Sequence, residues 1–107
     1  MDRNNYLAFR RCFVPSTVRL VIVAESPPAS GKYFYDSAGA VTEPLFRALT
    51  RQLGVDSLSK KGGLLEFQRR GWLLVDATYE PVNKLGGAAR NAVIVRDYPL
   101  LVADLRA

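Results

Sequence analysis

The chain has 107 residues, 49% of them hydrophobic and 23% charged, which is typical of one soluble globular domain. Its longest apolar run, Leu20 to Ala24, is far shorter than the roughly 18 to 20 residues of a membrane-spanning helix, so we expect no membrane span. With 15 Lys and Arg against 10 Asp and Glu, the net charge of +5 favours an anionic partner. The N-terminus lacks the continuous apolar core of a secretory signal, which predicts a cytoplasmic protein.

Two residue counts exclude whole classes of chemistry. The chain has no histidine, so one chain cannot carry a Ser-His-Asp or Cys-His arrangement or a His-ligated zinc ion. Cys12 is the only cysteine and can form neither an intrachain disulfide nor a thiolate metal cluster. We expect Cys12 to be a buried or half-buried small hydrophobe, and any chemistry to come from carboxylates, lysine or backbone amides.

The first clear element in chain order is a strand from Val18 to Ala24. Its near-continuous Val, Leu and Ile run predicts a central parallel strand covered on both faces. The segment from Glu25 to Gly39 then carries Pro, Ser and Gly turn residues over an unusual length. Long ordered loops in compact domains are often functional, so we expect this one to belong to a site.

A βαβ unit is the expected result of the next elements. The apolar spacing from Val41 to Leu53 predicts a helix with Thr42 as its N-cap and Gly54 just past its end. A second helix is predicted from Lys60 to Arg70, and Gly71 separates it from a buried strand over residues 72–75.

The C-terminal part gives weaker signals. Residues 78–87 are loop-like, residues 88–95 fit helix or strand equally, and residues 97–107 predict a last helix with Pro99 in its first turn. Two strands are too few for a stable open parallel sheet. We therefore expect residues 1–107 to be either a single α/β domain whose sheet is completed by association, including a homo-oligomer, or the N-terminal portion of a larger domain.

Ligands of parallel sheets bind at the carboxyl ends of the strands, which directs attention to the residues after Ala24 and Val75. Glu25, Ser26, Pro27 and Pro28 follow the first strand, with the aromatic run from Tyr33 to Tyr35 shortly after, and Asp76 follows the second. This order of elements resembles the uracil-DNA glycosylase superfamily. In that order a buried strand runs into a Gly-Glu-Ala-Pro-Gly-like motif, which is followed by a Gly with an aromatic residue, a helix, and a second strand that ends in a polar residue. The resemblance covers roughly residues 18–84 and extends to Pro81 and Lys84.

The resemblance implies a three-layer αβα fold with a parallel sheet, here incomplete at its C-terminal side. It also implies a DNA-repair activity in which the protein hydrolyses the N-glycosidic bond of a flipped base without a metal or cofactor. Glu25 would position or activate the attacking water, and Ser26 and Pro27 would approach the substrate. Phe34, or Tyr35 after a one-residue shift, would stack on the base. Asp76 would read the base edge, and Lys32, Lys84 and Arg90 would contact DNA phosphates.

Departures from the motif favour a second hypothesis. Asp76 stands where an Asn is common, Ala24 and Pro28 replace glycines, and a His-Pro-Ser-like segment is absent. The alternative is a non-catalytic α/β module that binds nucleic acid or a nucleotide.

Each candidate also has an ordinary structural interpretation. Glu25 would be a loop acid paired with a cation, the aromatic residues would pack in the core, and Asp76 would cap the following turn. The basic residues would be solvated surface groups.

Overall fold

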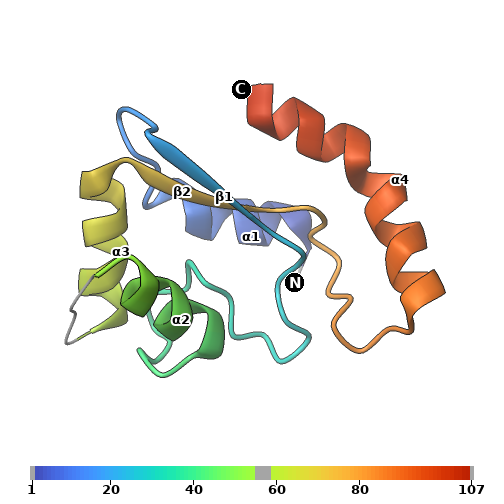
Figure 1. The fold of residues 1–107 in the computed structure, drawn as a ribbon, viewed down its shortest axis with the longest axis horizontal. Helices are drawn as coiled ribbons and strands as arrows, with labels where there is room; N and C mark the ends of the chain where they lie inside the picture. The colour runs from blue at the N-terminus through green and yellow to red at the C-terminus, as the bar shows by residue number, and fades with distance from the viewer. Residues whose placement is uncertain (1, 55–58, 107) are drawn as a thin grey trace.

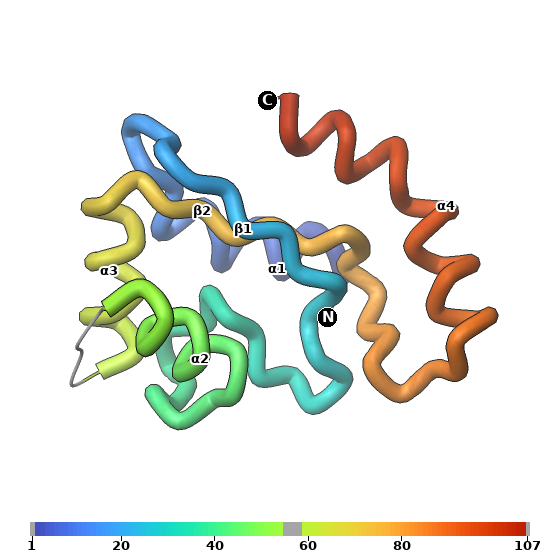
Figure 2. The backbone as a smooth tube through the Cα atoms, in the orientation of Figure 1, coloured from blue at the N-terminus to red at the C-terminus, as the bar shows by residue number. Residues whose placement is uncertain are grey.

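The computed structural model describes residues 2–54 and 59–106. The described part is a small α/β globule with four helices and two parallel strands (Figures 1 and 2). In chain order the elements are α1 (Arg3–Arg11), β1 (Leu20–Ala24), α2 (Pro44–Gln52), α3 (Lys60–Arg70), β2 (Trp72–Asp76) and α4 (Gly87–Arg106).

The two strands form the βαβ unit that the sequence predicts. They pair in parallel with Leu20 opposite Trp72 and Ala24 opposite Asp76, and α2 and α3 make up the connection between them. The first strand begins two residues later than predicted, at Leu20, and the second extends one residue further, to Asp76. The coarse α/β prediction is therefore confirmed.

The crossover helices keep the predicted order with one correction. The first begins at Pro44 with Glu43 as its N-cap, so the prediction of Thr42 as the cap was wrong. Proline at the first helical position fixes φ where no backbone donor is needed, which places the start there. Gly54 lies just past the helix with φ of +70°, as predicted.

Helix α3 has the predicted bounds and a complete set of terminal signals. The Ser59 hydroxyl accepts a hydrogen bond from the Gly62 amide at 3.0 Å, and Gly71 ends the helix with φ of +79°. A Cβ at position 71 would also clash with the Thr17 carbonyl. Gly71 therefore sets both the helix end and the close approach of the chain that leads into β1.

The N-terminal helix α1 was not predicted. Asp2 and Asn5 form a capping box, in which each side chain accepts a hydrogen bond from the other residue's backbone amide, at 2.9 and 3.0 Å. Tyr6 and Leu7 are the buried residues of the helix. Cys12 caps the other end and is exposed, which corrects the expectation that it is buried or half-buried. The helix turns Cys12 away from the side that buries Tyr6 and Leu7.

Strand β1 is not a central strand covered on both faces. Val21 and Val23 are 39% and 51% exposed, and β2 is the neighbour on which β1 packs among the described elements. A continuous apolar run is compatible with either environment, because the sequence does not show what covers each face. This expectation was wrong.

The core is dominated by aromatic side chains, several of them from the long loop between β1 and α2. Tyr33, Phe34 and Tyr35 are each at most 3% exposed. The Phe34 ring packs against the rings of Phe46 and Phe67, with centroids 5.7 and 5.3 Å apart. The long loop therefore provides a large part of the core instead of lying over it.

A buried ion pair joins this loop to both crossover helices. The Lys60 ammonium lies 2.6 Å from the Glu43 carboxylate and donates a second hydrogen bond to the Tyr33 carbonyl, also at 2.6 Å. The other carboxylate oxygen of Glu43 accepts a hydrogen bond from the Ala40 amide at 2.8 Å. Each charge is thus satisfied by at least two partners.

Helix α4 is one continuous helix, so residues 88–95 are helical and Pro99 lies inside the helix and not in its first turn. The helix changes direction along its length in Figure 1. It contributes no fully buried residue, and polar contacts attach it. Arg10 of α1 binds Asp104 through two hydrogen bonds of 2.7 and 2.8 Å and also donates to the Tyr79 hydroxyl at 2.8 Å.

The buried ion pair makes a testable prediction about stability. Lys60→Met leaves the buried Glu43 carboxylate without its counterion, so we expect a loss of about 3–5 kcal/mol in the free energy of unfolding. The double variant Glu43→Leu/Lys60→Met removes both charges and should recover most of this loss. Urea denaturation measures both values.

Lys61→Met is the matched control, because Lys61 is exposed on the same helix. We expect it to change the free energy of unfolding by less than about 0.5 kcal/mol. Equal effects of the two lysine substitutions would contradict a specific role of the buried pair.

Candidate functional site

A cavity of about 320 Å³ lies at the carboxyl ends of the two strands, where the sequence places the site. Its size is at the lower end of the range of small-molecule pockets. Five of the predicted site residues line it, namely Ser26, Pro27, Lys32, Phe34 and Asp76. The fold therefore brings together residues that are up to fifty positions apart in the sequence.

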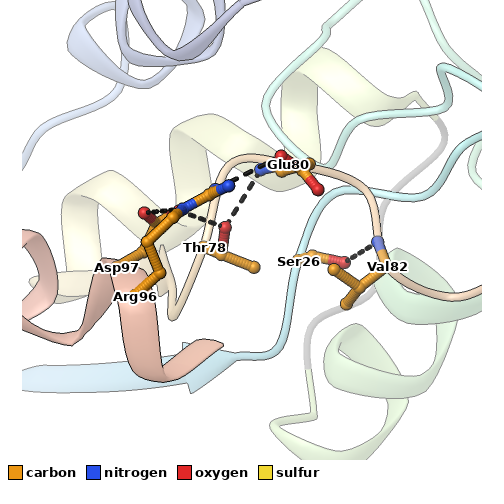
Figure 3. Close-up of polar contacts among 6 residues, drawn as sticks. All are labelled: Ser26, Thr78, Glu80, Val82, Arg96 and Asp97. Atoms are coloured by element: carbon orange, nitrogen blue, oxygen red, sulfur yellow. Dashed lines mark hydrogen bonds and ion pairs between the residues drawn. The ribbon is translucent and has the colours of Figure 1, made fainter. Parts of the chain in front are cut away.

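Hydrogen bonds between the loops that follow the strands hold the cavity in shape. The Ser26 hydroxyl accepts from the Val82 amide at 3.2 Å (Figure 3), and the Ala29 amide donates to the Asn83 side chain at 2.9 Å. Ser26 thus joins the loop after β1 to the loop after β2. This contact gives Ser26 a structural role in addition to its place in the cavity wall.

Asp76, the last residue of β2, is the most unusual group of the site. Its side chain is buried, and Oδ2 has no hydrogen-bond partner within the described residues. Burial raises the pKa of Asp76 from 3.8 to about 7, and the positive charge of Arg10 opposes this shift. A protonated carboxyl both donates and accepts hydrogen bonds, as a side-chain amide does. Near neutral pH, Asp76 can therefore donate as well as accept a hydrogen bond.

A second cavity of about 390 Å³ lies on the other side of Asp76, between the loop after β2 and α4. Four of its polar residues, Thr78, Glu80, Arg96 and Asp97, are paired with one another (Figure 3). The Thr78 hydroxyl donates to Asp97 at 2.6 Å, and Arg96 binds both Asp97 and Glu80. The hydrogen bond from Arg96 lowers the pKa of Asp97. These contacts attach α4 to the loop after β2 and account for the polar side chains of Thr78, Glu80, Arg96 and Asp97.

Phe34 and Tyr35, the two candidates for stacking on a base, are placed differently. Phe34 lies in the core but also lines the cavity. Tyr35 is not a cavity residue, and its hydroxyl accepts a hydrogen bond from the Leu74 amide at 2.8 Å. Burial raises the pKa of Tyr35 to about 12. The arrangement favours Phe34 over Tyr35 as the aromatic residue of the site.

Glu25 directly follows β1 but does not line the cavity. Its side chain is 46% exposed, and its carboxylate lies 3.5 Å from the Arg90 guanidinium. The structure therefore brings Glu25 together with Arg90, a predicted DNA-binding residue, and not with Phe34 and Asp76. The carboxyls that line the cavity are those of Asp76 and Glu43, and Glu43 is occupied by Lys60.

The three basic residues proposed to contact DNA are not clustered. Lys32 is exposed and lines the cavity, and Lys84 is exposed in the loop that precedes α4. Arg90, in the first turns of α4, is partly buried and bound to Glu25. Of these three residues, Lys32 is the one that forms part of the cavity wall.

Tyr33 and Glu43 are among the polar residues of the cavity wall that sequence reasoning did not single out. Tyr33 entered only as one end of a run of three aromatic residues. The Tyr33 hydroxyl is buried without a hydrogen-bond partner in the described residues, and burial raises its pKa. No local pattern marks either residue, because both reach the site through the long loop between β1 and α2.

Comparisons with protein-family models, curated proteins and solved structures found no match to this chain. None of the described helices is long and apolar enough to cross a membrane. Within residues 2–54 and 59–106, no three His, Cys, Asp or Glu side chains are grouped to hold a metal ion. The functional argument therefore depends on the geometry of the cavity.

The raised pKa of Asp76 predicts a pH dependence of stability. Its pKa of about 7 in the folded state exceeds its ordinary value of 3.8, so the folded protein binds more protons between these values. The resulting stabilisation is complete below about pH 4 and is lost as the pH rises to about 7, with a total on the order of 2–4 kcal/mol.

Chemical denaturation of the wild-type protein and Asp76→Asn from pH 4 to 8 isolates this contribution, because Asn does not titrate. The control Asp36→Asn removes a partly exposed carboxylate of the long loop. The difference between wild type and Asp76→Asn should change across this range, and parallel pH profiles would show that Asp76 titrates normally.

Proposed function

We propose that this protein is a uracil-DNA glycosylase-like protein of the three-layer αβα type that takes one unpaired base of DNA into the cavity at the strand ends. The observation that carries the proposal is Asp76, a residue of the cavity wall whose buried carboxyl has one oxygen, Oδ2, without a partner in the described residues. A base bound in the cavity would supply that partner.

The energetics of buried polar groups support this role for Asp76. A buried polar atom without a hydrogen bond costs about 1–3 kcal/mol, and most such atoms in native proteins are satisfied. With a pKa of about 7, the carboxyl is present in both protonation states near neutral pH. It can therefore accept from a ring N–H or donate to a ring carbonyl, and these are the two groups that alternate along the edge of an oxidised pyrimidine or purine.

The remaining walls of the cavity suit a planar ring. Pro28, Pro44 and Leu45 provide the accessible apolar surface, and Phe34 is a nearly buried part of the same wall. Aromatic side chains stack on bases irrespective of sequence. Lys32 lies at the same cavity, where its exposed ammonium group can approach a phosphate. The protein's net charge of +5 favours such contacts.

Hydrolysis of the glycosidic bond is the second part of the proposal, and one observation favours it. General acid and base catalysis works best with a group whose pKa is near the working pH, and the pKa of Asp76 is raised to about 7 inside the cavity. Glu25, the residue to which the resemblance assigns water activation, lies outside the cavity wall. We therefore assign to Asp76 the role of a general acid, whose protonated carboxyl donates to a ring carbonyl of the departing base, and we assign water activation to no residue of the cavity. A non-catalytic module that binds the base without releasing it is the alternative.

Base binding is tested by protein-observed NMR titration with free uracil, hypoxanthine and cytosine. We expect Asp76→Ala to weaken binding roughly tenfold or more, because it removes the group that pairs with the base edge. Phe34→Leu should weaken binding through loss of stacking. Asp36→Asn is the control and should bind normally. Equal affinities of the wild type and Asp76→Ala would contradict the proposed site.

Base release is tested on labelled oligonucleotides that carry uracil, hypoxanthine or xanthine, with alkali to cleave abasic sites. We expect release by the wild type and a loss of about 10²- to 10⁴-fold in Asp76→Ala, the usual contribution of a general acid or base. Glu25→Ala should retain release. A loss confined to Glu25→Ala would assign water activation to Glu25, and no release by a folded protein that binds the base would establish the non-catalytic alternative.

A further inference from the structure

The outer edge of β1 is open. The strand pairs with β2 along one edge, and in Figures 1 and 2 no other element of the described chain runs along the opposite edge. Leu20, Val21 and Val23 are 40%, 39% and 51% exposed. A two-stranded sheet is marginal in isolation, and parallel sheets are usually covered. The edge is thus a surface suited to pairing with another strand.

The backbone of β1 shows which groups are free to pair. The Leu20 amide donates to the Gly71 carbonyl at 3.2 Å, and the Ala24 carbonyl accepts from the Ala77 amide at 2.8 Å, so both residues face β2. Backbone groups alternate in direction along a strand, which turns the amides and carbonyls of Val21 and Val23 toward the open edge. Val21 and Val23 are two positions apart, which is the spacing at which hydrogen-bonded residues recur along a strand of an antiparallel pair.

The sequence of the edge is complementary to itself when it is reversed. In an antiparallel pair of two copies centred on Ile22, Val21 of one copy lies opposite Val23 of the other, and the two residues exchange both backbone hydrogen bonds. Continued one residue beyond each end of the strand, the same register brings Arg19 opposite Glu25. The Arg19 amide and the Glu25 carbonyl bond to Gly71 and Thr78 on the β2 side, at 2.6 and 3.1 Å, so this pair is made by the side chains and adds no backbone hydrogen bond. Opposite charges facing each other across two strands stabilise the pairing, and the twofold symmetry produces this ion pair twice.

Other registers lack this match. Moving the centre by half a residue places an outward-facing valine opposite an inward-facing residue, which breaks the backbone pairing. Moving it to Val21 or Val23 keeps the backbone pairing but leaves Arg19 or Glu25 opposite a valine. The present partner of Glu25 is Arg90, at 3.5 Å in an exposed position, and that contact leaves the carboxylate accessible to a second cation.

We propose that this protein forms a symmetric dimer in which the β1 strands of two copies pair antiparallel, centred on Ile22, to give a continuous four-stranded sheet. The occupant of the open edge is a second copy of the chain, selected by the two Arg19 to Glu25 ion pairs. The exposed Val21 and Val23 side chains of both copies then form one apolar cluster on the same face of the sheet.

Sedimentation equilibrium over a range of protein concentrations tests the dimer. We expect a monomer–dimer equilibrium for the wild type, and Arg19→Glu should weaken association by about tenfold or more because it places like charges opposite each other. The charge-swapped variant Arg19→Glu/Glu25→Lys should recover dimer formation. Arg47→Glu, an exposed change on α2, is the control and should associate like the wild type.

Disulfide trapping tests the register independently of dimer strength. In a Cys12→Ser background, Val21→Cys and Val23→Cys create residues that lie directly opposite each other in the proposed pair, at a Cα separation of about 5.5 Å that a disulfide can span. Mild oxidation should give a covalent dimer in which mass spectrometry identifies 21 to 23 cross-links. A wild type that stays monomeric, a dimer insensitive to Arg19→Glu, or cross-links in another register would each overturn the proposal.

Discussion

The ion pair between Lys60 and Glu43 is the interaction on which the rest of the structure depends. It fixes the start of α2 to the start of α3, and its hydrogen bonds to the Tyr33 carbonyl and the Ala40 amide hold both halves of the long loop. Gly39 is required beside it, because a Cβ there would overlap the Glu43 carboxylate. A loop with this many turn residues would otherwise have little to define its path. Held in place, it carries three aromatic side chains into the core and forms a wall of the cavity.

The two buried carboxyl groups of the cavity wall, those of Glu43 and Asp76, differ in their hydrogen-bond partners. Glu43 has a lysine and a backbone amide as partners, so burial costs it little and it serves the fold. Asp76 is buried as deeply, and its Oδ2 has no partner within the described residues. Burial without compensation raises its pKa to about 7, which makes it the group of the cavity best suited to bind or transfer a proton. The same chain thus contains a satisfied and an unsatisfied carboxyl within one wall.

Local signals in the sequence marked the C-terminal ends of α2 and α3 and the start of α3, and long-range packing was not accessible from them. Gly54 and Gly71 mark helix ends because a left-handed backbone is a property of the residue itself. The exposure of β1 and Cys12 depends on which elements cover them, and no residue pattern encodes that. Helix α1 had a readable signal in the Asp2 and Asn5 capping box, although the short helix has too few apolar positions to show a clear period. Strand order predicted that Ser26, Pro27 and Asp76 lie close together, and they line one cavity, since parallel strand ends converge.

Glu25 shows why a position at a strand end does not by itself determine a role. Side chains alternate in direction along the chain as it leaves the strand, so Ser26 lines the cavity while Glu25 lies outside its wall beside Arg90. A carboxylate that is 46% exposed and close to a guanidinium is suited to pairing with charges at the surface, where solvent compensates its burial. Asp76 has the opposite environment, with no solvent and no partner for Oδ2. The proposed intermolecular contact and the proposed proton transfer thus need different carboxyls, and the chain has one in each environment, each at the end of a strand.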